Sequence, residues 1–332
     1  MGATKRNRQF IVRNLALVLS ALSIIALVLH VVPVPEVGEP VTSIALPDSR
    51  FVEVDGVLVH YVDHGGGDVL FVLLHGFGAS VFTWRELIPE LSRIGRVVAF
   101  DRPGFGLTER VDPSKLGFNP YHVDGAVRLT CNFVKQVRRN ESRLVVIGHS
   151  AGGGLALLLP LMCDLNISAL VLIAPAWKQL RKQWYEHVLY GTPLADKYGP
   201  LLARAMVNRL EEILYRAWYN KSLITPSILE GYKYPLRARN WDKGLYWLMK
   251  YREYPDIRDD LSKIKAPVLI IHGVNDEIIP LSSSIELYEL LSTHTFTDLV
   301  IINECGHLPH EEKPNLVLDV VKRFLKNTVS NG

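Results

Sequence analysis

Cysteine is scarce in this chain of 332 residues, and neither sign of charge dominates. The three cysteines, Cys131, Cys163 and Cys305, have a spacing typical of neither a disulfide framework nor a zinc site, so the redox compartment stays open. The net charge of +3 argues against a nucleic-acid partner. No internal repeat is visible. Hydrophobic residues make up 48% of the chain, enough for one sizeable core and a subdomain.

The N-terminal residues 1–14 form a basic flank without any acidic residue, and an apolar run over residues 15–32 follows. This run has roughly the 18 residues that a membrane-spanning helix needs as a minimum. A cleaved signal peptide would have a shorter apolar region and a small-x-small cleavage site, which is absent here. We therefore expect a transmembrane signal-anchor at residues 15–32, with a cleaved signal or an organellar transit segment as the alternative.

The charges around this run also predict a topology. The basic flank precedes the run, whereas Glu36 and Glu39 follow it, so the positive-inside rule places the N-terminus in the cytoplasm. The lipid bilayer is then a partner through residues 15–32, and the remaining chain lies on the non-cytoplasmic side. Residues 33–50 contain several prolines and are expected to form a semi-rigid linker.

The most informative motif is Gly148-His149-Ser150-Ala151-Gly152. The apolar run 144–147 before it predicts a strand, and the apolar pattern 155–161 after it predicts a helix. A serine at the apex of so tight a turn needs a strained backbone, and its neighbours must lack bulk, as Gly148 and Gly152 do. The hydroxyl of Ser150 then lies at a helix N-terminus, which favours negative charge. The motif therefore predicts a nucleophilic serine.

A serine hydroxyl needs a base within hydrogen-bond reach and an acid that orients the base. The apolar run 267–271 predicts a strand, and Asp276 lies in the loop after it. The run 299–302 predicts the next strand, which leads into Gly306-His307. We therefore expect Ser150, Asp276 and His307 to form the catalytic set.

Both assignments have rivals nearby. Glu277 is the alternative acid, and Asp276 could instead cap a turn. His310 is the alternative base, although the glycine before His307 favours His307. His75 and His149 are expected to be structural neighbours of the turns.

The negative charge that forms on a carbonyl oxygen under attack must be met by preorganised backbone N–H groups. Ala151, directly after the nucleophile, supplies one. The other is expected from Phe77, because the apolar run 69–74 ends in the glycine-flanked turn His75-Gly76-Phe77-Gly78.

At this point the chain resembles the α/β-hydrolase fold family, in its capped serine-hydrolase branch. The resemblance covers about residues 51–325 and rests on five motifs in the right order, each after a strand-like run. They are His75-Gly76-Phe77, Asp101-Arg102-Pro103-Gly104-Phe105-Gly106, the Ser150 motif, the Asp276 loop and Gly306-His307. The order serine, aspartate, histidine is the one that this family requires. Asp101 and Arg102 resemble a family turn that braces the loops around the site.

The pattern and the resemblance together predict an α/β fold with a mainly parallel eight-stranded sheet and helices on both faces. We expect a core of residues 51–176 and 258–332. Between residues 177 and 257 the strand pattern lapses, and helical periods rich in aromatic and basic residues predict a helical cap.

The motifs and the resemblance together predict a serine hydrolase that cleaves a carboxylic ester of a lipophilic small molecule through an acyl-enzyme on Ser150. The apolar run at residues 15–32 predicts that this hydrolase is membrane-anchored. This chemistry requires neither cofactor nor metal, and none is expected. Monoacylglycerol-lipase-like esterases, carbon–carbon hydrolases of ring-cleavage products, aminopeptidases and perhydrolases share the motifs, so the fold alone does not choose among them. A hydrolase-like receptor without activity is the alternative from another class. The oligomeric state stays open.

Overall fold

A computed structural model of the chain describes Phe10, residues 13–21 and residues 31–329. Eight strands form one sheet in the order β1-β2-β4-β3-β5-β6-β7-β8. The pairs β1–β2 and β2–β4 are antiparallel, and the other pairs are parallel. The predicted eight-stranded, mainly parallel sheet is therefore confirmed. The strands are β1 (Arg50–Val54), β2 (Val57–Gly65), β3 (Val69–Leu74), β4 (Arg96–Phe100), β5 (Arg143–His149), β6 (Ala169–Ile173), β7 (Val268–Gly273) and β8 (Thr297–Ile302).

The first two strands form a hairpin closed by Asp55 and Gly56. Both residues have positive φ angles, 52° and 82°, as the tight turn of a two-residue hairpin requires. The central strands β3, β5 and β6 are apolar along almost their whole length, because parallel strands covered on both faces bury every side chain.

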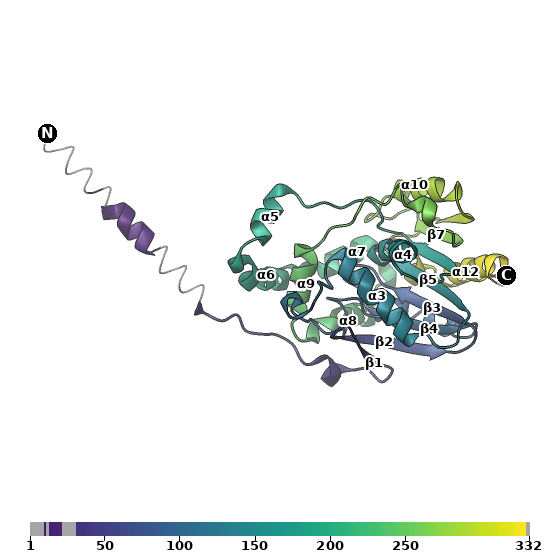
Figure 1. The fold of residues 1–332 in the computed structure, drawn as a ribbon, viewed down its shortest axis with the longest axis horizontal. Helices are drawn as coiled ribbons and strands as arrows, with labels where there is room; N and C mark the ends of the chain where they lie inside the picture. The colour runs from purple at the N-terminus through teal and green to yellow at the C-terminus, as the bar shows by residue number, and fades with distance from the viewer. Residues whose placement is uncertain (1–9, 11–12, 22–30, 330–332) are drawn as a thin grey trace.

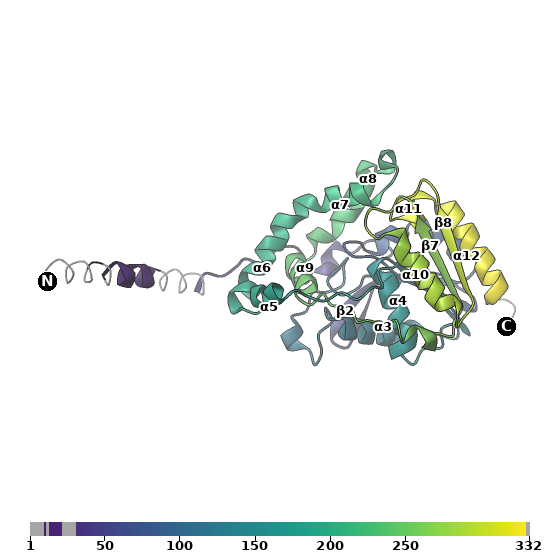
Figure 2. The same cartoon turned by 90° about the horizontal axis from the view of Figure 1, so that it is seen from above.

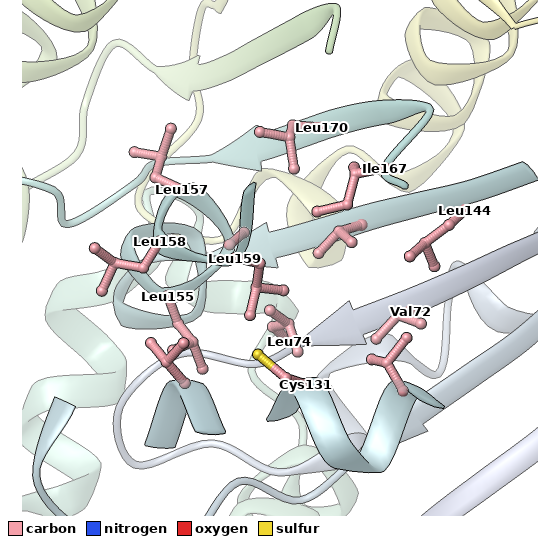
Figure 3. Close-up of a cluster of buried hydrophobic side chains, with 14 of the residues drawn as sticks. Val72, Leu74, Cys131, Leu144, Leu155, Leu157, Leu158, Leu159, Ile167 and Leu170 are labelled. Atoms are coloured by element: carbon pink, nitrogen blue, oxygen red, sulfur yellow. The ribbon is translucent and has the colours of Figure 1, made fainter. Parts of the chain in front are cut away.

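Helices cover both faces of the sheet (Figure 1). Buried side chains of α3, α4 and α10 pack on one face, and those of α2 and α12 pack on the other. Figure 3 shows the first of these cores, where leucines of α4 lie against Val72, Leu74 and Leu144 of the strands. The bounds are α2 (Ile88–Leu91), α3 (Val123–Val137), α4 (Ala151–Met162), α10 (Leu281–Ser292), α11 (Pro309–Glu312) and α12 (Pro314–Thr328).

Between β6 and β7 the chain forms helices rather than strands. They are α5 (Trp184–Tyr190), α6 (Pro193–Met206), α7 (Leu210–Ala217), α8 (Pro226–Lys233) and α9 (Trp241–Lys250). Within residues 50–329, helices α5, α6 and α9 lie at the end opposite α12, and both views agree on this (Figures 1 and 2). We keep the name cap for residues 177–257.

The expected membrane anchor is contradicted. Within the described residues, no helix has both the length and the apolar character needed to cross a membrane. The longest helices that the structure describes, α3 and α12, have 15 residues each, whereas a bilayer-spanning helix needs about 20. The expectation of a span at residues 15–32, with the catalytic part on the far side of a membrane, is therefore withdrawn. Residues 22–30 of that range lie outside the described residues.

The cysteines also differ from expectation. Cys131 in α3 and Cys163 after α4 form a disulfide, with their Cα atoms 6.0 Å apart. They are 32 residues apart in the chain, a spacing that carries no signal of pairing, and the packing of α3 beside α4 brings them together. Cys305 is buried and free.

Candidate active site

Ser150 lies between β5 and α4, at the turn that the motif predicts. Its φ and ψ angles are 52° and −121°, a conformation that L-residues rarely adopt and that marks stored backbone strain. The turn is tight enough that a Cβ atom added to Gly152 would lie 2.1 Å from the carbonyl oxygen of Leu74. A Cβ atom on Gly148 would lie 2.4 Å from the carbonyl oxygen of Gly152. Both glycines are therefore sterically required.

His307 and Asp276 meet from two neighbouring loops. The Nδ1 atom of His307 lies 2.7 Å from Oδ2 of Asp276, so Nδ1–H donates to the carboxylate and Nε2 is left to accept a proton. The other carboxylate oxygen, Oδ1, accepts the backbone N–H groups of Ile278 and Ile279 at 2.7 and 2.9 Å. These bonds fix the carboxylate in one orientation.

A second histidine, His272 on β7, also contacts Asp276. Its Nε2 lies 3.2 Å from Oδ2 of Asp276 and donates to the carbonyl oxygen of Ile279 at 3.0 Å. Burial acts to raise the pKa of Asp276, but hydrogen bonds with His272 and His307 outweigh it and lower the pKa below its ordinary value. Asp276 is therefore ionised at neutral pH. The sequence did not predict a role for His272, because a histidine inside an apolar strand is usually an ordinary core residue.

The rival residues lie elsewhere. Glu277 points to solvent, with Oε2 3.7 Å from Nε of Arg216. His310 is completely buried, and its Nε2 lies 2.9 Å from Oγ1 of Thr83. Glu277 therefore does not take the place of Asp276 beside His307, and His310 does not take the place of His307 beside Asp276.

The turn at His75-Gly76-Phe77 lies against the nucleophile. A Cβ atom on Gly76 would lie 3.2 Å from Cβ of Ser150. Burial, and then the nearby Arg102 charge, lower the pKa of His75 to about 3, so its ring is neutral. Its Nε2 accepts the N–H of Arg102 at 3.0 Å, and its Nδ1–H donates to the carbonyl oxygen of Gly76 at 2.8 Å.

That second bond orients a peptide group. In a trans peptide the carbonyl oxygen and the following N–H point in opposite directions, so the bond from His75 to Gly76 also fixes the N–H of Phe77. Ala151 is the first residue of α4, where a backbone N–H has no partner within the helix. Both expected donors are thus backbone groups whose orientation is fixed by local structure.

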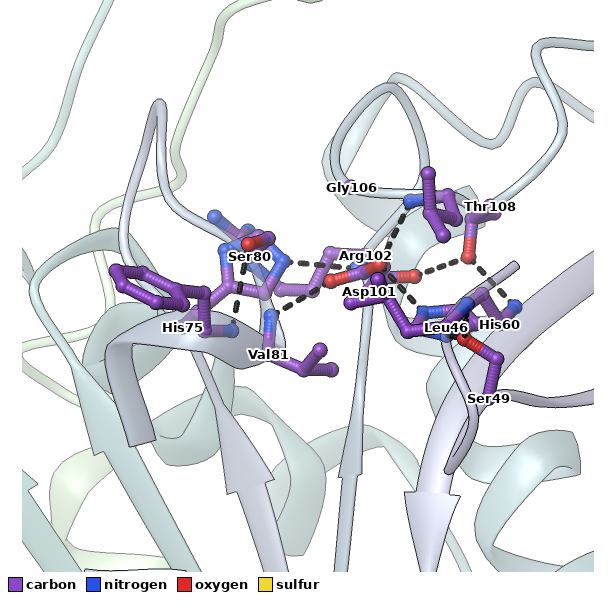
Figure 4. Close-up of polar contacts among 12 residues, drawn as sticks. Leu46, Ser49, His60, His75, Ser80, Val81, Asp101, Arg102, Gly106 and Thr108 are labelled. Carbon is purple, nitrogen blue, oxygen red and sulfur yellow. Dashed lines mark hydrogen bonds and ion pairs between the residues drawn. The ribbon is translucent and has the colours of Figure 1, made fainter. Parts of the chain in front are cut away.

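Asp101 braces the surrounding loops, as the resemblance implies (Figure 4). Its Oδ1 accepts the N–H of Val81, and its Oδ2 accepts the N–H of Leu107, both at 2.7 Å. Nδ1 of His60 also lies 2.7 Å from Oδ2, and Nε2 of His60 lies 2.8 Å from Oγ of Ser49. Ser49, His60 and Asp101 therefore form a serine–histidine–aspartate contact set, which the sequence did not reveal.

Ser150 and His307 open into one cavity of about 270 Å³ between the core and the cap. Most of its walls are apolar, contributed by the Phe77 and Phe105 loops and by helices α6, α7 and α9. Its apolar cap residues include Met206, Leu210, Leu214, Trp241, Leu245 and Met249. The described residues contain no cluster of three or more histidine, cysteine or acidic side chains that could hold a metal ion.

The comparisons with known proteins agree with this architecture. Residues 71–320 match the model of the alpha/beta hydrolase family, and the chain belongs to that family. It is 27% identical over 283 residues to the uncharacterized hydrolase YugF of Bacillus subtilis, covering 84% of this chain and 98% of that protein. It is also 27% identical over 298 residues to 2-hydroxy-6-oxo-2,4-heptadienoate hydrolase of Pseudomonas putida, covering 86% and 98%.

A solved structure shows the same fold. The serine hydrolase CarC, involved in carbazole degradation, matches with a TM-score of 0.65 and 24% identity, covering 84% of this chain and 98% of that one. The chain is thus a hydrolase of the α/β fold, similar to ring-cleavage-product hydrolases and esterases.

Proposed function

We propose that this chain is a serine hydrolase that cleaves a carboxylic ester of an apolar small molecule through an acyl-enzyme on Ser150. The observation that carries the proposal is that Ser150, at its strained turn, opens into the same apolar cavity as His307, whose Nδ1 is bound to Asp276. The three residues supply a nucleophile, a base and a group that orients the base.

In the first half of the reaction, Oγ of Ser150 attacks the ester carbonyl while Nε2 of His307 takes the hydroxyl proton. Asp276 holds the ring in the tautomer that this requires and stabilises the resulting imidazolium. The N–H groups of Phe77 and Ala151 stabilise the oxyanion of the tetrahedral intermediate. The carbon–oxygen bond to the alcohol then breaks, and His307 returns the proton to the leaving oxygen.

In the second half, His307 removes a proton from water, which attacks the acyl carbon. The bond between the acyl group and Oγ of Ser150 breaks, and His307 gives the proton back to Oγ. The products are the alcohol and the carboxylic acid. The apolar walls of the cavity support an apolar acyl or alcohol group, because burying such a group gains about 25 cal/mol per Å².

The test is the hydrolysis of a series of 4-nitrophenyl esters of increasing acyl length. Ser150→Ala and His307→Ala should each lower kcat by about four to six orders of magnitude, and the double variant should be little worse than either, because the residues act as a unit. Full activity of either single variant would refute the assignment.

Carbon–carbon bond hydrolysis is the second candidate. It is favoured by the relative from Pseudomonas putida, whose name describes a dienoate hydrolase, and by the match to CarC. Following the absorbance of a ring-cleavage dienoate distinguishes the two reactions. Turnover of the dienoate in preference to every ester would favour this candidate. Absence of both activities in folded protein would favour a hydrolase-like receptor.

A further inference from the structure

Arg110 lines the cavity but has no role in the proposed mechanism. Of the described residues that line the cavity, it is the one with a permanent charge; the others are apolar, uncharged or histidine. Its side chain lies in the loop after β4 and is 5% exposed. It passes beside α9 of the cap, where a Cβ atom on Gly244 would lie 2.7 Å from Cγ of Arg110. Arg110 therefore lies where core and cap meet.

Arg96, another buried arginine, has carboxylate partners: it is paired with Asp63 and Glu141, both at 2.8 Å. The partly buried Arg85 is paired with Glu311 at 2.6 Å. Arg110 forms no ion pair with any described residue. An isolated charge in an apolar interior is costly, and proteins rarely keep one without a compensating group.

The guanidinium of Arg110 is held rigidly by neutral groups. Nη1–H donates to the carbonyl oxygen of Thr108 and Nη2–H to that of Gly106, each at 2.7 Å. A guanidinium has five N–H donors, so these two bonds leave others unused, and Nε has no hydrogen-bond partner among the described residues. The group is thus preorganised, with donors to spare.

The carboxylate of Asp101 attracts Arg110 through space, but the two groups form no ion pair. Asp101 is already bound by His60 and by the N–H groups of Val81 and Leu107. Arg102, in the same loop, is also buried without a carboxylate partner among the described residues and stacks on the Phe105 ring, 5.3 Å from its centroid. Burial lowers the pKa of Arg110 to about 10, so the group still carries its charge at neutral pH.

We propose that Arg110 is an anion-recognition residue, and that the substrate of this site is an ester whose apolar body carries a carboxylate. The inference rests on the proposed function and specifies its substrate class. A carboxylate suits a guanidinium because its two oxygens match the planar N–H fork. The bound carboxylate neutralises the isolated charge, while the apolar part of the substrate fills the remaining cavity.

The experiment compares esters that differ only in this charge. In one pair the acyl part carries the charge: 4-nitrophenyl hydrogen suberate against its methyl ester. In the other pair the leaving group carries it: 3-acetoxybenzoate against methyl 3-acetoxybenzoate. Wild-type protein should prefer the anionic member of at least one pair by about 10- to 100-fold in kcat/KM, the contribution of charge-assisted hydrogen bonds.

Variants locate the preference. Arg110→Met should reduce the ratio of anionic to neutral kcat/KM to about one, whereas Arg110→Lys, which keeps the charge, should retain part of the preference. The matched control is Arg252→Met, which removes a half-exposed arginine of the cap that pairs with Glu186 outside the cavity. It should keep the wild-type ratio.

The outcomes separate this inference from the proposed function. Equal rates for both members of each pair in wild-type protein would overturn the role of Arg110 but would not count against the proposed esterase activity. This comparison uses wild-type protein alone, so it does not depend on whether a variant folds. A preference that survives Arg110→Met would overturn it as well. Failure of wild-type protein to hydrolyse any of the esters would instead count against the proposed function.

Discussion

The ring of His149 connects the nucleophile turn to the loop of the proposed base: its Nε2 lies 2.9 Å from the carbonyl oxygen of His307. Burial, with smaller contributions from His310 and His307, lowers the pKa of His149 well below its ordinary value, so the ring is neutral. Nε2–H therefore donates to the His307 carbonyl. The rings of His149 and His307 also pack together, with centroids 4.7 Å apart.

This contact predicts a positioning role for His149. His149→Phe keeps a ring but removes the donor, so we expect kcat to fall by about 10-fold with little change in KM, because the base loop is no longer fixed to the turn. His149→Gln, which can present an N–H group to the same carbonyl, should recover part of the loss. Steady-state kinetics on a 4-nitrophenyl ester checks this. A purely structural role would lower thermal stability in both variants and leave kcat unchanged.

The orientation of His307 should depend on Asp276 and not on its neighbour. Asp276→Asn removes the carboxylate that selects the tautomer, and kcat should fall by about 10³- to 10⁴-fold. Glu277→Gln, an equivalent change one residue along, should stay near wild type because Glu277 lies at the surface, where it pairs with Arg216. The reverse result would reassign the acid to Glu277.

The tight turn at Ser150 should tolerate no added atom at Gly152. Gly152→Ala forces a Cβ atom toward the Leu74 carbonyl oxygen, so we expect a loss of about 1–3 kcal/mol in the free energy of unfolding and a fall in activity. Gly66→Ala is the control, since nothing lies within 4 Å of its added Cβ atom and its φ is not positive. Its stability should stay within about 0.5 kcal/mol of wild type. Thermal unfolding measures both, and equal Tm values would refute the steric argument.

The disulfide should stabilise the packing of α3 beside α4. Replacing Cys131 and Cys163 together by alanine should lower the free energy of unfolding by about 2–4 kcal/mol. Reductant should lower the Tm of wild-type protein and of Cys305→Ala, but not that of the double variant. A wild-type Tm that is insensitive to reductant would show that the two cysteines are not bonded in solution.

The parts of the fold that the sequence predicts well are local. Strand, turn and helix around Ser150 follow one another within a few residues, and the glycines that the turn needs stand in the motif itself. The hairpin turn at Asp55 and Gly56 is local in the same way. The contacts of His272 with Asp276, of His149 with His307 and of Cys131 with Cys163 join separate elements, and no pattern along the chain reports them.

The membrane anchor fails for a different reason. The evidence for it was an apolar run of minimal length beside a basic flank, and no described helix reaches the length that a span requires. The sequence shows that Arg110 is charged, but it does not show which groups lie near the guanidinium. The lack of a carboxylate partner for Arg110 depends on the fold and could not be predicted.

Ser150 as the nucleophile can be tested directly against Ser49, which forms a contact set with His60 and Asp101. Ser49 lies outside the strained turn, and its Oγ accepts the N–H of Leu46 at 2.9 Å. The decisive measurement is to label the folded protein with a fluorophosphonate and map the modified residue by peptide mass spectrometry. We expect one phosphonyl group per chain, on Ser150, with labelling lost in Ser150→Ala and kept in Ser49→Ala. Labelling at Ser49, or of folded Ser150→Ala to the wild-type extent, would show that Ser150 is not the nucleophile.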